Sequence, residues 1–239
     1  TNIFLGANKH WRKIDETLCT FLTSKTLLEK YWNKFKLRLN PDQDGLIETC
    51  LRNQKSSFAE FLNQQKKTKF CLDNSKDSAV LLFNVLSKGD LDSVEWLKDK
   101  MGSFKIEDHI NHLLKVTNLE GVKWVYSQIK GKFKLSEVGY EPFLHSCSYR
   151  RMRIAMFLVE KSIEEGEYLD ISKNSYECLH SFVTNPKNRF KDLYEFIIKV
   201  AGQLNLPPVN TPEINRKIKQ SLKDNSCKLD LDTYLESLS

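Results

Sequence analysis

The stretch "EEGEYLDISKNSYECLHS", residues 164–181, decides the fold of this chain. It has too few large apolar residues to form the interior of a helix. It nevertheless lies between two apolar-rich stretches that resemble each other, "MRIAMFLVEK" (152–161) and "DLYEFIIKV" (192–200). Such a segment is either a linker or a structured connection that recurs, and the rest of the sequence distinguishes these two interpretations.

The composition is that of an ordinary folded protein. The 239 residues are 40% hydrophobic and 28% charged, which is too apolar for a disordered chain. No apolar run approaches the roughly 20 residues that span a bilayer, and the first residues lack the apolar core of a signal peptide. Six cysteines are too sparse for a disulfide scaffold. We therefore expect an intracellular protein, cytoplasmic or nuclear, with no membrane insertion.

Apolar residues follow a helical spacing nearly everywhere, which predicts a mostly α protein. Four segments align without a gap: "LIETCLRNQKSSFAEFL" (46–62), "LLFNVLSKGDLDSVEWL" (81–97), "HINHLLKVTNLEGVKWV" (109–125) and "PFLHSCSYRRMRIAMFL" (142–158). Each segment ends in an aromatic residue followed by an aliphatic one. A fifth copy, 178–197, needs about three extra residues. The closing residues 62, 97, 125, 158 and 197 lie 28 to 39 positions apart.

Each aligned segment predicts two short antiparallel helices with a polar turn between them. Such short helices do not persist alone in water, so each pair must bury its apolar stripe against its neighbours. The sequence therefore predicts an all-α fold, an α-solenoid of about five stacked helix-turn-helix repeats at 45–203. Helical caps are expected at 1–44 and 204–239, the second including "TPEINRKIKQSLKDN" from Thr211, where Thr precedes Pro at a helix start.

These residues resemble the ankyrin repeat, a family with a period of about 33 residues, each repeat having a turn and two helices. "LVEKSIEEGEYLDISKNSYECLH" (158–180) is similar to the passage from one second helix through an outward loop to the next repeat, and "GDLDSVEWL" (89–97) resembles the start of a second helix. The resemblance covers roughly 46–200. It implies that residues 164–175 form a finger between repeats. A tetratricopeptide or another α-solenoid is the structural alternative.

No residue pattern predicts catalysis, a metal site or a cofactor. Four residues of the types that bind zinc form two pairs, His145 with Cys147 and Cys178 with His180. Residues two apart on a helix point in roughly opposite directions, so neither pair can face one ion while it is helical. Asn40, Asp42 and Asp44 match the first ligand positions of a calcium-binding loop. The twelfth position, where such a loop has Glu, is Leu51 in this chain. Phosphate-binding loops and known catalytic motifs do not occur. We expect a core role for the histidines and cysteines and a protein that is not an enzyme.

Two tryptophans occupy the same column of the alignment. Trp96 and Trp124 stand where Phe61 and Phe157 stand in the other copies. Aromatic residues at helical spacing usually belong to a core, so we expect both tryptophans to pack between helices and not to form a ligand cage.

Basic residues gather in the turns between the paired helices. They include Arg52, Lys55, Lys88, Lys115, Arg150, Arg151, Lys187, Arg189 and Lys191. In a stack of repeats, equivalent turns lie side by side and would form a basic ridge. We expect a partner protein with an acidic surface to bind there and at the fingers, with Arg52, Lys55, Lys88, Arg150, Arg151, Lys187, Arg189 and Tyr168 as contact residues.

Two other functions remain open at this point. Nucleic acid or another polyanion could bind the basic ridge, although the net charge of +6 is modest for that role. An enzyme of unrecognised type, or an effector with a hidden site, is the third hypothesis. The preferred hypothesis is a non-enzymatic scaffold or adaptor of the ankyrin-like kind.

Overall fold

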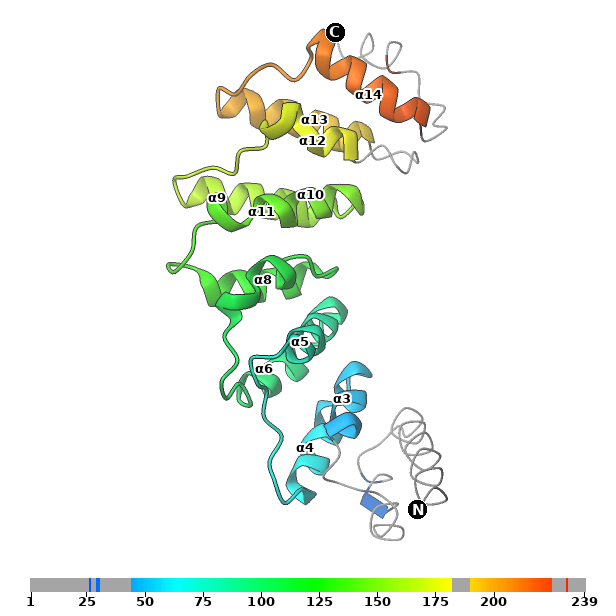
Figure 1. Cartoon of the computed structure of the whole chain (residues 1–239), viewed down its shortest axis with the longest axis vertical. Helices are drawn as coiled ribbons and strands as arrows, with labels where there is room; N and C mark the ends of the chain where they lie inside the picture. Colours follow the sequence, from blue (N-terminus) through cyan, green and yellow to red (C-terminus); the bar gives the residue numbers. More distant parts are fainter. Residues whose placement is uncertain (1–25, 27–28, 31–43, 182–189, 225–230, 232–239) are drawn as a thin grey trace. The chain divides into compact units, whose positions relative to one another are not determined.

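The computed structural model describes residues 26, 29–30, 44–181, 190–224 and 231, and the structural statements below concern these residues. They form twelve α-helices, one short 3₁₀ helix and no strand, which confirms the all-α prediction for this part of the chain (Figure 1). The helices are α3 (Asp44–Arg52), α4 (Ser56–Gln65), α5 (Lys76–Lys88), α6 (Leu91–Lys98), η1 (Ile106–His109), α7 (Ile110–Leu113), α8 (Leu119–Ile129), α9 (Leu135–Val138), α10 (Tyr140–Ser148), α11 (Met152–Glu164), α12 (Lys173–Ser181), α13 (Phe190–Gln203) and α14 (Pro212–Asp224).

The chain divides into two compact units, Thr1–His109 and Ile110–Ser239. In the first unit α3 packs on α4 and α5 packs on α6. In addition α3 contacts α5, and α4 contacts α6. First helices therefore contact first helices, and second helices contact second helices.

The second unit repeats this order of contacts. The first helices of successive pairs, α7, α10 and α12, each contact the next, and α12 contacts α14. Among the second helices, α8 contacts α11. In the described residues, consecutive helices therefore pack in pairs, as α10 does with α11. Their stacking as repeats stays a prediction. The turn between α12 and α13, which holds Lys187 and Arg189, lies outside them.

The apolar positions that define the sequence alignment are buried in every copy. Three columns of the alignment are buried throughout. They are the second position (Ile47, Leu82, Ile110 and Phe143), the small or β-branched position (Ala59, Val94, Val122 and Ala155) and the closing aliphatic residue (Leu62, Leu97, Val125, Leu158 and Ile197). Burying side chains of this size contributes about 1.5–3 kcal/mol for each large aliphatic residue. The alignment therefore identified the apolar core of the hairpins.

The two aligned tryptophans differ in their surroundings. Trp124 is buried, as expected, whereas Trp96 is only half-buried. The Trp96 indole stacks on Phe70 with ring centroids 5.7 Å apart, and its Nε1–H donates to Glu60 Oε2 at 2.5 Å. That hydrogen bond is the main cause of the lowered pKa of Glu60. The core packing expected for both tryptophans therefore holds for Trp124, whereas Trp96 is only partly buried and links α6 to the Glu60 carboxylate of α4.

Side-chain hydrogen bonds join residues about one repeat apart in both units. In the first unit they include Gln54 to Lys88 O, Lys88 to Arg52 O, Trp96 to Glu60 and Asn74 to Asp108, which are 34 to 36 positions apart. In the second unit they include Leu135 N–H to Glu165, Tyr176 to Pro207 O, Arg151 to Lys115 O and Tyr140 to Glu177, which are 30 to 37 positions apart. Each of these bonds links one helical pair or loop to the next.

The turns between paired helices share one backbone conformation. Gln54, Gly89 and Arg150 occupy the same alignment column, and all three have positive φ (59°, 72° and 59°). In the first and third of these turns the next residue closes the helix, because Lys55 N–H donates to Cys50 O at 2.9 Å and Arg151 N–H donates to Ser146 O at 2.7 Å. This is the left-handed helix ending that favours glycine.

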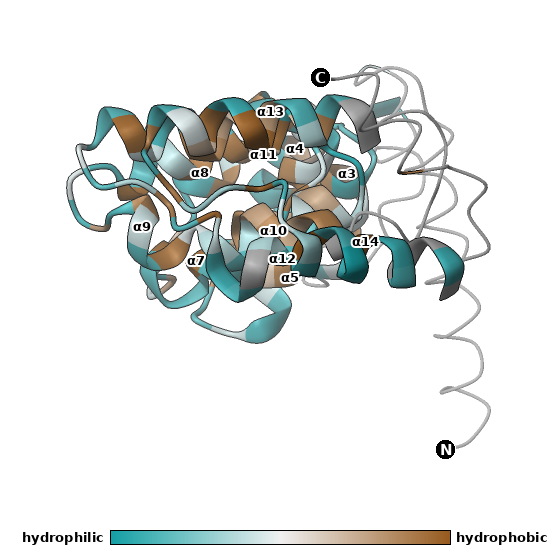
Figure 2. Cartoon of the chain, turned by 90° about the horizontal axis from the view of Figure 1, so that it is seen from above, coloured by the Kyte–Doolittle hydropathy of each residue, from teal (hydrophilic) through white to brown (hydrophobic). Residues whose placement is uncertain are grey.

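The C-terminal helix begins where the sequence predicts. The Thr211 hydroxyl accepts a hydrogen bond from Ile214 N–H at 3.3 Å, and α14 begins at Pro212. Ile214 and Ile218 are buried, whereas the exposed residues of α14 are polar apart from Pro212 (Figure 2). The role of α14 as a cap stays a prediction. Most of the predicted N-terminal cap lies outside the described residues.

None of the described helices is long and apolar enough to cross a membrane.

The positive φ values give opposite predictions for two substitutions. We expect Gln54→Gly to stabilise the protein and Gly89→Ala to destabilise it, each by roughly 0.5–1 kcal/mol, because only glycine adopts the left-handed region without a steric penalty. The Gln54→Gly variant also loses the hydrogen bond from Gln54 to Lys88 O, but this bond is long (3.4 Å) and exposed, so its loss costs little by comparison. Urea unfolding of both variants beside the parent protein measures the difference. A loss of stability in Gln54→Gly would contradict the shared turn geometry.

Candidate functional site

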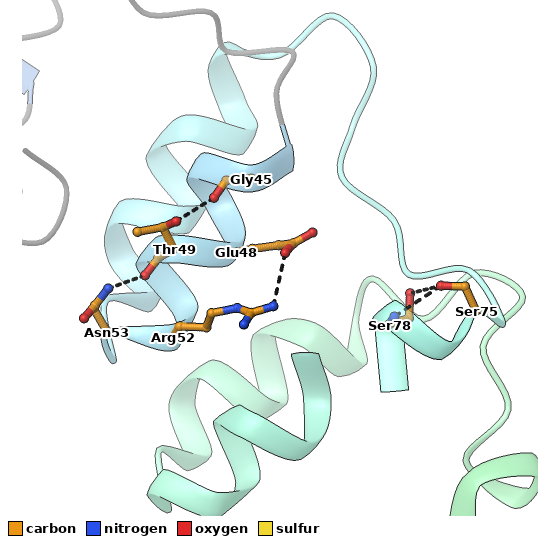
Figure 3. A network of polar contacts seen from close by, with 7 residues as sticks. All are labelled: Gly45, Glu48, Thr49, Arg52, Asn53, Ser75 and Ser78. Atoms are coloured by element: carbon orange, nitrogen blue, oxygen red, sulfur yellow. Dashed lines mark hydrogen bonds and ion pairs between the residues drawn. The ribbon is translucent and has the colours of Figure 1, made fainter. Parts of the chain in front are cut away.

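The basic residues predicted to contact a partner in the first unit bond mainly to the protein itself. Arg52 pairs with Glu48 on the same helix at 3.5 Å (Figure 3). Lys88 Nζ donates to the main-chain carbonyl of Arg52, and Lys55 Nζ lies over the Phe58 ring at 5.2 Å. The Lys88 bond joins the turn after α5 to the turn after α3, whereas the Arg52 and Lys55 contacts are local to α3 and to the start of α4. The partner-binding role of the three cations stays a prediction.

Arg151 has a similar role in the second unit. Its Nη1 donates to the Lys115 carbonyl at 3.1 Å, which ties the α10–α11 turn to the segment after α7. Lys115 Nζ in turn lies 3.7 Å from the Glu141 carboxylate. Lys187 and Arg189, the remaining predicted cations, lie outside the described residues.

Tyr149 gives the α10–α11 turn an exposed aromatic ring. Its side chain is 64% exposed, yet it contacts two neighbours. The His145 ring lies 4.5 Å from it, centroid to centroid, and the Arg151 guanidinium lies 5.2 Å from its ring centre. We call Lys115, His145, Tyr149, Arg150 and Arg151 the turn cluster. Sequence reasoning missed Tyr149, although "SYRR" is the only one of the aligned turns with an aromatic residue.

Arg150 is the strained member of the turn cluster. Its φ of 59° lies in the left-handed region, which is unfavourable for a side chain with a Cβ by roughly 1–2 kcal/mol. Its Nε and Nη2 atoms are buried without a hydrogen-bond acceptor. Leaving buried donors of a cation unpaired is costly. Arg150 therefore has a strained backbone and, on its guanidinium, two buried donors without a hydrogen-bond partner.

The electrostatic field of the turn cluster is positive. The pKa of His145 is lowered, first by burial and then by the charges of Arg151 and Lys115. His145 is therefore neutral at pH 7, because its ordinary pKa is already about 6.5. Burial also lowers the pKa of Arg151, which stays charged in proteins at any physiological pH. The cluster thus places one arginine cation, Arg151, against an aromatic ring.

A pocket of about 540 Å³ lies beside the turn cluster. The start of α11 forms one side of it with Arg151, Met152, Arg153 and Ile154, and residues 117–120 form the other side. Glu120 is the acidic residue of its lining, and it is paired with Lys123 at 2.8 Å. Helix α11 has no side-chain N-cap and no acidic residue in its first turn. The positive charge of this pocket is therefore only weakly compensated.

Tyr168 lies on the loop between α11 and α12, in the segment predicted to be a finger. It is 45% exposed. The loop is anchored to α11, because the buried Ser162 hydroxyl accepts a hydrogen bond from Leu169 N–H at 3.0 Å. An ion pair from Lys134 to Glu167 joins it to the preceding loop. The finger therefore holds Tyr168 in an ordered loop on the surface.

A second pocket, of about 490 Å³, lies between these two loops. Its lining mixes lysines and glutamates with Phe133 and Tyr126. The pKa of Tyr126 is raised to about 12, mainly by burial and further by Glu165 and Glu164. Because the lining charges have both signs, this pocket does not select a ligand of one charge.

The described residues hold no group of three His, Cys, Asp or Glu side chains that could bind a metal ion. Of the four zinc-ligand residues, Cys147 and Cys178 are buried, and burial followed by a hydrogen bond with Cys178 raises the pKa of the Cys147 thiol. The His180 side chain lies outside the described residues, as do Asn40 and Asp42. Asp44 is ion-paired with Lys66.

No protein-family model, curated protein or solved structure matches the chain.

The electrostatics of the turn cluster predict how His145 titrates. Replacing Arg151 with Met should raise the pKa of His145, because one of the two cations that disfavour the imidazolium is removed, while burial still holds the pKa below its ordinary value. The lowered pKa also means that His145 reduces stability as the pH falls below about 6.5, where the unfolded chain takes up the proton first. NMR titration of the His145 ring measures the shift. Arg153→Met is the matched control, and an equal shift in both variants would contradict the assignment.

Proposed function

We propose that this chain is a non-enzymatic protein-binding module whose helical hairpins stack as an ankyrin-like α-solenoid. The observation that carries the proposal is the set of side-chain bonds between residues 30 to 37 positions apart, within each unit, which equals about one repeat. In a solenoid each repeat contacts only its neighbours, and its loops and turns remain at the surface for binding. The contacts between successive first helices support the same arrangement.

The binding surface consists of the fingers and the turns. Exposed tyrosines stand on both, Tyr168 on the α11–α12 finger and Tyr149 on the α10–α11 turn. Tyrosine is enriched among the residues that contribute most to protein–protein binding, because it buries a large area while losing little conformational entropy. This supports a protein as the partner and an ankyrin-like scaffold or adaptor as the role.

The nucleic-acid alternative is less well supported. It requires free cations along the turns, since affinity for duplex DNA grows with the number of phosphates neutralised. Lys88 and Arg151 instead bond to main-chain carbonyls of neighbouring turns, and Lys115 faces Glu141. We therefore favour an acidic protein surface over a polyanion.

The proposal is tested by panning the immobilised full chain with a displayed random peptide library. Fluorescence anisotropy then measures the binding of selected synthetic peptides and, in parallel, of a 20-base-pair duplex and a single-stranded RNA. We expect selected peptides to bind saturably, with an affinity that falls less steeply with salt than that of either nucleic acid. Enrichment of no peptide, together with nucleic-acid binding that falls steeply with salt, would overturn the proposal.

A further inference from the structure

Tyr149 is the most exposed large apolar or aromatic side chain in the described part of the chain, at 64% against 45% for Tyr168 and 37% to 39% for the other exposed large hydrophobic residues. It is nevertheless held in place by His145 on one side and by the Arg151 guanidinium over its ring. A ring ordered before binding loses little entropy when a partner covers it. Tyr149 therefore has the properties of an interface anchor.

Cations outnumber carboxylates around this anchor. Arg151 lies over the ring and has donors beyond the one that Lys115 O accepts. Exposed Arg153 adds a second guanidinium at the rim of the adjoining pocket. The carboxylates nearby, Glu141 and Glu120, are paired with lysines. Planar guanidinium groups match carboxylates in geometry and form two parallel hydrogen bonds with them. An acidic side chain is the complementary ligand.

We propose that the turn cluster and the adjoining pocket recognise an acidic segment of a partner protein. An Asp or Glu carboxylate of that segment binds Arg151 and Arg153, and an apolar side chain beside it packs on the Tyr149 ring. The shallow pocket of about 540 Å³ receives the next residues of the segment. This inference rests on the proposed protein-binding function and names the class of partner and the site that it uses.

The test uses the full chain and two pools of fluorescein-labelled 12-residue peptides. In the first pool Asp or Glu alternates with apolar residues, and in the second Asn or Gln replaces the acids. We expect saturable binding of the acidic pool only, and at least ~10-fold weaker binding in Tyr149→Ala and in Arg153→Met, as for anchor residues of interfaces. Exposed Ile198→Ala on α13 and Arg216→Met on α14 are the matched controls, and their affinities should change by less than about 2-fold.

Arg153→Met also separates binding from folding. Because Arg153 is exposed, this variant should unfold at nearly the same temperature as the parent while its affinity for the acidic peptides falls. Equal binding of both pools, or equal losses in the control variants, would overturn the inference. If peptides selected by panning bind and neither Tyr149→Ala nor Arg153→Met weakens their binding, this site is wrong while the protein-binding function stands. Failure of every peptide to bind would instead count against the function itself.

Discussion

Each helical hairpin of this protein depends on its neighbour, because two short helices do not bury all the apolar side chains that they carry. Leu82 and Leu97, or Phe143 and Leu158, are fully buried only because helices of the adjacent pairs cover them. The polar contacts follow the same rule. Trp96 donates a hydrogen bond to Glu60, 36 positions before it, and Tyr140 donates one to Glu177, 37 positions after it. Stability is therefore built from interactions between neighbours within each unit.

This dependence gives the basic turn residues two roles. Lys88 and Arg151 each donate to a carbonyl of the preceding turn, so their first function is to hold adjacent turns together. A cation that is already bonded contributes less to a partner than a free one, because binding must either share or break the bond. The α10–α11 turn differs, since it also carries the exposed Tyr149 ring and is followed by exposed Arg153. The turn cluster is therefore better suited to a partner than the other turns described.

The hydrophobic pattern was sufficient to predict the helices, the turns and the buried columns. It identified Ile47, Ala59 and Leu62 and their counterparts, because burial of an apolar stripe imposes a spacing that the sequence displays directly. It also identified the start of α14, where Thr211 caps the helix. These features depend on local sequence and on periodicity.

The details of the candidate site could not be predicted in the same way. Trp96 and Trp124 share a column, yet only Trp124 is buried, and the column alone does not determine how far each ring is covered. The alignment showed cations in the turns but not the carbonyls that they reach, which lie one repeat away. Nor did it reveal the strained backbone of Arg150, since Gly89 and Gln54 in the same column show no common residue preference. Such features arise from tertiary contacts.

The central claim, that each hairpin is coupled to the next, is tested most directly by a double-mutant cycle between α10 and α12. Tyr140 donates to Glu177 at 3.1 Å, and the cycle combines Tyr140→Phe with Glu177→Gln under urea unfolding. The account predicts a coupling free energy of about 0.5–3 kcal/mol, whereas Tyr140→Phe combined with Trp96→Phe, which lies in the other unit, should be additive within about 0.5 kcal/mol. Additive effects of Tyr140→Phe and Glu177→Gln would contradict it.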